Sequence, residues 1–327
     1  MADRTSGGAS ADLRGILPVN KPSGITSHDV VVKVRRFLGI QKIGHTGTLD
    51  PLASGLLLLC VGAATRFAGY LTRQDKTYRA RIILGASTAT DDTEGTVVFH
   101  FEGDLQKLVT DERLNKAIEE LSGRIDQVPP AFSSKKIGGV PAYKLARRGE
   151  KAELAAVPVH IGPVRVLNVD LPELEVEFSC SAGTYLRAFA RDLGSKLGCG
   201  GHLGSLVRTA CGCFLLEQAS SLEELSAVGR KKIKDDYLLP VEDALSRMPA
   251  VYLDTSGQKK IYHGRAVDLA EEEVTLEEGL DISPGPYEVR LYVGKEIFVG
   301  IGMLEYLGIN TGWLRPKRLM LEAFPPQ

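Results

Sequence analysis

Long apolar runs are missing from this sequence. None of its 327 residues belongs to a stretch of the roughly 20 apolar residues that would span a bilayer. The opening segment, MADRTSGGASADLRG, has no apolar core behind its charges. These absences predict a chain that neither crosses a membrane nor is exported, and therefore a cytoplasmic protein.

Cysteine is scarce, and its spacing is not that of a disulfide or zinc framework. The five cysteines are dispersed, without a C-x-x-C pair, so we expect reduced thiols. Cys199, His202, Cys211 and Cys213 could be drawn as a metal site. Because zinc sites usually contain paired C-x-x-C or H-x-x-x-H elements, and this C-x-C lies in an apolar run, we expect buried thiols and no metal.

Nucleotide-cofactor and hydrolase motifs are also missing. The sequence has no G-x-G-x-x-G after a strand, no Walker loop, no G-x-S-x-G and no H-E-x-x-H. We therefore expect a protein without a bound cofactor.

Charge of one sign does not dominate the chain. With 40 basic and 41 acidic residues the net charge is -1, which argues against nonspecific coating of nucleic acid. Residues 131–151 are an exception, because they hold six basic side chains against one acid. A local basic surface suits a polyanion bound at a defined place, although a solvated helix face explains it equally well. The six are Lys135, Lys136, Lys144, Arg147, Arg148 and Lys151.

The length predicts two domains. Residues 1–13 are small and polar and predict a disordered tail. Residues 14–248 mix helical and strand patterns, whereas residues 249–327 have the short strands and frequent turns of a second domain.

Local patterns predict the elements around one loop. A strand over 15–20 breaks at KPSG, and Thr26 with Asp29 predicts a capping-box helix that stops at Gly39. Residues 44–55 hold three glycines and a proline and lead into the apolar run 56–61, which predicts an elaborate loop before a buried strand. Further along, we expect strands over 76–85, 164–169 and 174–180, helices over 111–121 and 184–198, and a loop over 126–140.

Asp50 is the candidate catalytic carboxylate. It lies with His45 in the glycine-bracketed loop, where functional residues tend to occur, although an Asp before Pro often only caps a turn. Arg187 falls in the first turn of the helix over 184–198, and Arg191 lies one turn later on the same face. A cation at this helix end requires an anion, either Asp50 or a phosphate.

Tyr78 and Tyr185 stand in polar or basic settings. Such rings can stack on a base and use their hydroxyl groups, although a role in the core is equally compatible with either one.

Six motifs stand out along the chain: KPSGITS (21–27), HTGTLDP (45–51), DKTY (75–78), QVPPAFSSKK (127–136), GTYLR (183–187) and GCGGHL (198–203). Together they resemble the TruB family of pseudouridine synthases, which modify the T-loop uridine of tRNA. The agreement runs in the family's order over residues 15 to about 245 and weakens after residue 250. Val207 departs from it, since the family usually has a basic residue there.

The resemblance implies an α/β fold, with a mixed-sheet catalytic domain followed by a small C-terminal β-barrel of the PUA-like, RNA-binding type. It makes Asp50 the nucleophile and Arg187 its salt-bridge partner, and it stacks Tyr78 on the target uracil, where this residue can take the C5 proton. The implied substrate contacts, with a flap over 127–151 that closes on RNA, come from His45, Tyr185, Leu206, Lys21, Lys135 and Lys136.

The implied reaction flips one uridine out of the tRNA T-arm and needs neither a metal nor a guide RNA, and the protein would act as a monomer. Two alternatives stay open. One is a guide-dependent synthase like dyskerin, whose relatives lack the long basic flap. The other is an RNA chaperone, a role that can accompany catalysis.

Overall fold

The computed structural model describes residues 13–133, 135–150, 154–271, 274–277, 283–308 and 311–324. The side chains of Lys136, Pro141 and Arg147 lie outside this description, as does most of the predicted tail. Leu13, the last residue of that tail, is 1% exposed and belongs to the core.

Two sheets organise the described residues. The larger one has ten strands with the central order β1-β3-β13-β4-β12-β10-β7, and β2, β14 and β11 pair with β3, β13 and β12. It is a mixed sheet, because β13 runs parallel to β3 and antiparallel to β4. Its strands are β1 Gly15–Lys21, β2 Ile43–His45, β3 Ser54–Val61, β4 Lys76–Leu84, β7 Gly123–Gln127, β10 Val157–Ile161, β11 Arg165–Asp170, β12 Glu173–Cys180, β13 Gly201–Cys211 and β14 Phe214–Leu215.

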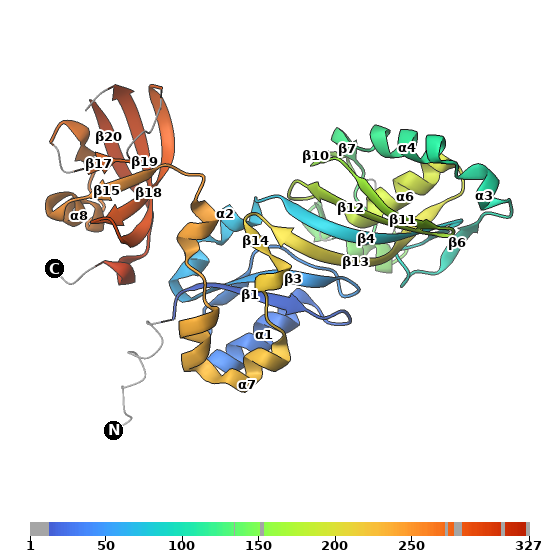
Figure 1. The fold of residues 1–327 in the computed structure, drawn as a ribbon, viewed down its shortest axis with the longest axis horizontal. Coiled ribbons are helices and arrows are strands. Elements are labelled where there is room, and N and C mark those ends of the chain that lie inside the picture. The colour runs from blue at the N-terminus through green and yellow to red at the C-terminus, as the bar shows by residue number, and fades with distance from the viewer. Residues whose placement is uncertain are drawn as a thin grey trace.

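The second sheet has six strands in the order β16-β20-β19-β18-β15-β17. Together with α8 it forms a lobe at one end of the elongated molecule (Figure 1). The predicted fold class, a mixed α/β sheet followed by a small β portion, is confirmed. The strands are β15 Ala250–Leu253, β16 Val267–Asp268, β17 Val274–Leu276, β18 Gly285–Val293, β19 Ile297–Gly308 and β20 Thr311–Leu319.

Two groups of helices pack on the larger sheet. α1 and α7 pack together beside β1, while α6 packs on β13 and contacts α4. The helices are α1 Ser27–Leu38, α2 Ala68–Thr72, α3 Leu105–Leu108, α4 Asp111–Glu120, α5 Ala142–Arg147, α6 Leu186–Leu197, α7 Leu222–Lys232 and α8 Thr255–Tyr262. Shorter turns are η1 Gly62–Phe67, η2 Leu216–Gln218, η3 Ile233–Tyr237, η4 Val241–Leu245, η5 Leu269–Glu271 and η6 Leu321–Ala323.

Local signals fixed the ends of two helices that frame the site. Thr26 caps α1 through the predicted capping box with Asp29, and Gly39 ends the helix in the left-handed region with φ 65°. Gly198 ends α6 in the same way, with φ 83°. The predicted helices over 27–39 and 184–198 are thereby confirmed.

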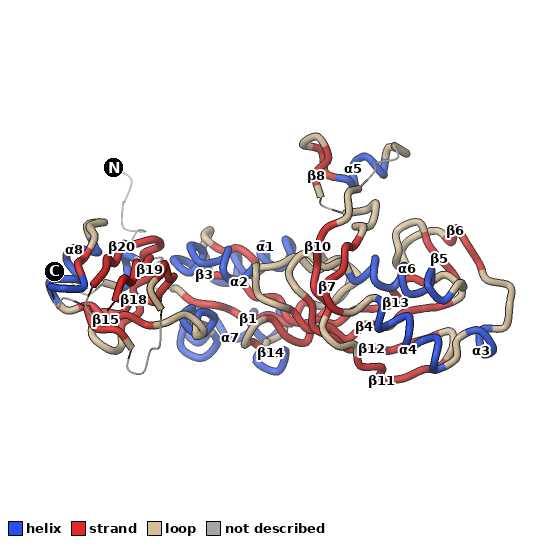
Figure 2. Tube along the Cα trace, turned by 90° about the horizontal axis from the view of Figure 1, so that it is seen from above, coloured by secondary structure: helices blue, strands red, loops and turns tan. Residues whose placement is uncertain are grey.

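The segment predicted as a loop over 126–140 contains more structure than expected. It includes a small hairpin of β8 Lys136–Ile137 and β9 Val140–Pro141, followed by α5. Figure 2 shows β8 and α5 standing out from the body of the molecule above β7 and β10. A second small hairpin, of β5 Ala86–Thr88 and β6 Val97–His100, lies after β4.

Two hydrophobic cores are buried. The first lies between the larger sheet and the helices α1, α4, α6 and α7. The second joins the other side of β1 and β3 to the second sheet, with Phe67 and Phe298 in ring contact at 5.6 Å between centroids. In the described part of the chain, no helix is both long and apolar enough to cross a membrane.

Candidate active site

The loop that carries Asp50 is fixed from the N-terminal end of α1. The Ser27 hydroxyl donates to the carbonyl of Leu49 at 3.0 Å and accepts from its amide at 2.8 Å. The amide of Gly24 donates to the Pro51 carbonyl at 2.8 Å. Asp50 is thus held between two anchored neighbours, although its own side chain is 42% exposed.

Lys21 supports the same loop from beneath. This fully buried side chain points its ammonium at the carbonyl oxygens of Pro22 at 2.9 Å, Ile25 at 2.6 Å and Pro51 at 3.4 Å. Burial lowers the pKa of Lys21, and the nearby Asp50 charge opposes that shift. The geometry gives Lys21 a role in loop architecture, rather than an exposed position from which it could contact a substrate.

Arg187 connects Asp50 to the rest of the site. Its Nε donates to Asp50 Oδ2 at 3.0 Å, and its Nη1 lies 3.5 Å from Asp92 Oδ2. The remaining donors reach the Thr90 carbonyl at 3.0 Å and the Phe132 carbonyl at 2.9 Å. Of the two anions that the sequence left open, the structure has Asp50, together with Asp92, which sequence reasoning missed.

The Arg187–Asp50–Asp92 cluster offsets an unfavourable position. Arg187 is the second residue of α6, where the helix dipole disfavours a cation. Its side chain is 9% exposed and that of Asp92 is 5% exposed, so both charges depend on each other and on their hydrogen bonds. Because Asp50 is the more exposed carboxylate, it is the one available to a substrate.

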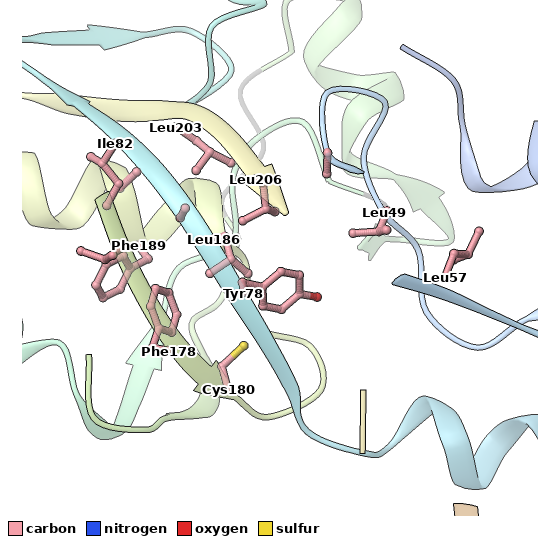
Figure 3. Packing of buried hydrophobic residues seen from close by; sticks show 14 of the residues in the cluster. Leu49, Leu57, Tyr78, Ile82, Phe178, Cys180, Leu186, Phe189, Leu203 and Leu206 are labelled. Carbon is pink, nitrogen blue, oxygen red and sulfur yellow. The ribbon is translucent and has the colours of Figure 1, made fainter. Parts of the chain in front are cut away.

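Tyr78 lies on β4 in an apolar setting beside Leu186, Leu206 and Cys180 (Figure 3). It is 7% exposed, and burial raises its pKa to about 12, so the hydroxyl keeps its proton at neutral pH. The guanidinium of Arg208 lies 5.9 Å from the centre of the ring and opposes the shift.

Arg208 was not among the residues that the sequence predicted for the site. It is 2% exposed and donates to the Leu56 carbonyl at 2.6 Å and the Gly47 carbonyl at 3.1 Å. This contact depends on the close approach of β13 to β3 at Gly55, where φ is 97° and a Cβ atom would lie 2.4 Å from the Arg208 carbonyl oxygen. No local pattern predicts it, because the pairing joins strands distant in sequence.

These side chains surround a cavity of about 430 Å³, within the range of ligand pockets in proteins. Five of the sequence-predicted site residues line it: Asp50, Tyr78, Arg187, Tyr185 and Leu206. Phe132, Lys76 and Arg208 also line it and were not predicted to do so. Lys76 is 6% exposed, burial lowers its pKa, and its ammonium donates to the carbonyl oxygens of Thr72 and Gln74.

Other predicted site residues do not line this cavity. His45 lies on β2, where burial lowers its pKa, and its Nδ1 is buried without a hydrogen-bond partner in the described part of the chain. Lys135 belongs to the projecting flap. The neighbouring Lys136 side chain is not among those that the structure describes. Among the described flap residues, Phe132 and Ser133 line the cavity, and those from Lys135 onward do not.

The cysteines are mostly buried, as expected, but Cys213 is exposed, and the expectation for it was wrong. Burial raises the pKa of Cys180, at the cavity wall, to about 11. Among the described residues, no group of three or more His, Cys, Asp or Glu side chains is arranged to hold a metal ion.

Two family models match the chain. The model for the TruB family pseudouridylate synthase (N terminal domain) matches residues 35–186, and that for the tRNA pseudouridylate synthase B C-terminal domain matches residues 187–246. A tRNA pseudouridine synthase B of Cupriavidus metallidurans is 40% identical over 316 residues, which cover 94% of this chain and 95% of that protein. A tRNA pseudouridine synthase B of a Mycobacterium species is 44% identical over 257 residues, which cover 77% of this chain and 84% of that protein.

Solved structures share the fold. The chain matches a Cbf5-Nop10-Gar1 complex with a TM-score of 0.70 at 23% identity, covering 95% of this chain and 85% of the other. The match to an H/ACA RNP bound to a substrate RNA has a TM-score of 0.70 at 22% sequence identity and covers 97% of this chain and 86% of the other. On the family models and the relatives, this chain belongs to the TruB family of pseudouridylate synthases and is an isomerase.

Proposed function

We propose that this enzyme converts the T-loop uridine at position 55 of tRNA to pseudouridine, with Asp50 as nucleophile. The name of its relatives, tRNA pseudouridine synthase B, supports the substrate class. The observation that carries the role of Asp50 is its ion pair with Arg187 at the wall of a cavity that Tyr78 also lines. The ion pair orients the carboxylate, and its exposed side is free to meet a base.

The chemistry needs no cofactor, because it conserves every atom and electron of the substrate. The N1–C1′ bond breaks, the uracil turns while still held, and a C5–C1′ bond forms. The C5 proton leaves and N1 gains one. A carboxylate and a cavity that retains the loose uracil are sufficient for this sequence of steps.

Tyr78 is proposed to stack on the uracil. Extruding a base from its stack costs a few kcal/mol, and stacking on an aromatic ring returns about 1–3 kcal/mol. Since the pKa of Tyr78 is raised to about 12, its hydroxyl begins as a donor. To take the C5 proton it would have to act as the phenolate, which the Arg208 guanidinium beside the ring stabilises.

The remaining parts are proposed to bind the rest of the RNA. Residues 14–248 would form the catalytic domain, whose flap over 127–151 closes over the T-arm with Lys135 and Lys136. Residues 249–327 would form a PUA-like RNA-binding domain. His45 would help hold the flipped-out nucleotides, and Tyr185 and Leu206 would line the base pocket. We expect a cytoplasmic monomer that acts without guide RNA.

Two other functions remain testable. A guide-dependent synthase is compatible with the fold, which this chain shares with a Cbf5-Nop10-Gar1 complex and an H/ACA RNP. The projecting basic flap favours direct binding of tRNA instead, because its charge supplies phosphate contacts. An RNA chaperone role can accompany either activity.

The test is to incubate purified wild-type and Asp50→Asn protein with unmodified tRNA, without guide RNA or cofactor, and to map pseudouridine along the RNA. We expect T-loop pseudouridine with the wild type and a loss of kcat of about 10⁴-fold or more in the variant, as for other nucleophile deletions. Asn has nearly the same shape, so tRNA binding should be retained. No pseudouridine with either protein would favour the guide-dependent or chaperone function.

A further inference from the structure

Two arginines on α6 meet two consecutive acids. Arg187 and Arg191 lie one turn apart, and while Arg187 faces Asp92, the Nη1 of Arg191 bonds Asp91 Oδ2 at 3.1 Å. The Nε of Arg191 also donates to Asp192 Oδ1 at 2.9 Å. Both Arg191 and Asp91 are largely buried, with side-chain exposures of 26% and 13%.

The backbone at Asp91 makes this double pairing possible. Consecutive residues of an extended segment point in opposite directions, so both carboxylates could not face one helix. Asp91 has φ 61°, and in the described chain it is the sole residue other than glycine with positive φ. Asp tolerates this conformation better than most residues, although at some cost. The strained turn therefore persists where it brings a carboxylate to Arg191.

Arg191 also reaches the first part of the flap. Its Nη2 donates to the Val128 carbonyl at 2.9 Å. The side chain of Gln127, 1% exposed, bonds both the amide and the carbonyl of Tyr185, at 2.8 and 3.1 Å. Residues 127–133, which we call the flap root, are thus tied to the start of α6, and the root ends in the two cavity-lining residues Phe132 and Ser133.

We propose that Arg191 is a positioning residue for the isomerisation, which holds the flap root on α6 through Asp91 and the Val128 carbonyl. This inference rests on the proposed function of the flap. The tip of the flap stands out from the body (Figure 2), so it can move while the root keeps the cavity wall beside Asp50 in place. Substrate binding then need not order the root as well.

The arrangement requires an arginine. One planar guanidinium donates from three separate nitrogens to two carboxylates and a carbonyl, whereas the three donors of an ammonium lie on one atom and would have to reach these acceptors from a single point. Arg191 makes no contact with Asp50 or Tyr78 among its described hydrogen bonds, so its effect on the reaction passes through the root.

Chymotrypsin tests the root directly in the free protein. The Phe132–Ser133 bond is tied down by Arg187 and becomes a substrate only when the root detaches. We expect Arg191→Ala to raise the initial rate of cleavage there by about tenfold, the size of effect of a lost charged hydrogen bond. The matched control is Lys196→Ala, which breaks the Lys196–Glu120 ion pair at the other end of α6 and should leave cleavage unchanged.

Two more variants test whether Arg191 and Asp91 hold the flap root through one common contact or through separate contacts. Asp91→Asn keeps a residue suited to positive φ and should raise cleavage by about threefold, since a neutral acceptor remains. The double variant Arg191→Ala/Asp91→Asn should cleave no faster than Arg191→Ala, because the two residues act through one contact. In steady-state assays with tRNA, Arg191→Ala should raise KM by about tenfold and leave kcat nearly unchanged.

Unchanged cleavage in both single variants, or multiplied effects in the double variant, would overturn the proposal. If Arg191→Ala fails to fold, the cleavage rate of Asp91→Asn still tests the proposal. Full rescue by Arg191→Lys, with a flatter salt dependence of tRNA binding in Arg191→Ala, would instead make Arg191 a phosphate contact. The cleavage experiment needs no RNA, so its result stands apart from whether the wild type forms pseudouridine.

Discussion

At the scale of single residues, Arg187 breaks a local rule and is compensated by distant neighbours. A cation in the first turn of a helix is unfavourable, yet this one is nearly buried and donates to Asp50, Thr90 and Phe132. Such departures from local preference tend to mark functional sites. The same holds for Arg208, which is buried between loop carbonyls and the Tyr78 ring.

Tyr78 gives a prediction in pH. Its folded pKa is raised to about 12 by burial, above the value near 10 of an exposed tyrosine. Because the folded pKa is raised, the protonated Tyr78 contributes fully to the free energy of unfolding below pH 10, and this contribution is lost as the pH rises from 10 through 12. The total loss is about 3 kcal/mol, at about 1.4 kcal/mol per pKa unit. The difference in tyrosinate absorbance between wild type and Tyr78→Phe should therefore show no ionisation of this residue until above pH 11.

Titration of Tyr78 near pH 10 would contradict this prediction and would mean that water reaches the ring. The control is Tyr143→Phe, in the projecting flap, for which no comparable burial applies.

At the scale of elements, α1 holds the loop that carries Asp50 through Ser27. Replacing Ser27 by Ala leaves both polar groups of Leu49 without this buried partner. We expect a loss of about 1–3 kcal/mol in the free energy of unfolding. Because displacements near the reacting atoms are costly, kcat should fall by about tenfold.

Urea unfolding and steady-state kinetics measure the two effects of Ser27→Ala. Ser226→Ala, on α7, removes an exposed hydroxyl whose one hydrogen bond among the described residues is to the Glu223 carbonyl, and it should change stability by no more than about 0.5 kcal/mol. Equal behaviour of the two variants would show that Ser27 does not fix the loop.

The flap is the element whose charge should matter for RNA. If Lys135, Lys136, Arg147 and Arg148 contact phosphates, replacing them by Ala should weaken tRNA binding and flatten its dependence on salt, by about 0.7–0.9 in log–log slope for each lost contact. Filter binding over a range of salt concentrations measures this slope.

A matched control for the flap variants removes positive charge elsewhere. Lys107 on α3 and Lys196 on α6 are partly or largely exposed, and their replacement by Ala should leave the slope unchanged. The same slope in the flap variants and the wild type would remove the flap from the RNA surface.

At the scale of the whole molecule, the two sheets share one hydrophobic core. Phe67, from the part with the larger sheet, contacts Phe298 of the second sheet, and they are 0% and 4% exposed. Phe298→Ala should lower the free energy of unfolding by about 3–5 kcal/mol. The neighbouring Ile297 is 39% exposed, so Ile297→Ala should cost less than about 1 kcal/mol.

Urea unfolding followed by circular dichroism measures both variants. A small loss with Phe298→Ala would mean that the second sheet contributes little to the stability of the rest. The Arg66–Glu322 ion pair, at 2.6 Å, bridges the same two parts but is about one-third exposed on each side, and we expect it to add little.

The sequence by itself determined the elements with local signals. The capping box of Thr26 and Asp29 and the terminal glycines Gly39 and Gly198 set helix ends, because caps act within a few residues. Alternation marked β4 and β12. A misplaced arginine in the first turn of a helix indicated an anionic partner, either Asp50 or a phosphate, and the family resemblance implied that the partner is Asp50, which is the pair observed.

Only the tertiary structure decided which side chains gather around Asp50. Neither Asp92 nor Arg208 was singled out by a local pattern, yet loop contacts bring Asp92 to Arg187 and strand pairing brings Arg208 to the cavity wall. Lys21, expected at the substrate, instead turns its ammonium to buried carbonyls. Local patterns do not encode such partners, because a buried charge finds its counterpart only when packing removes both from water.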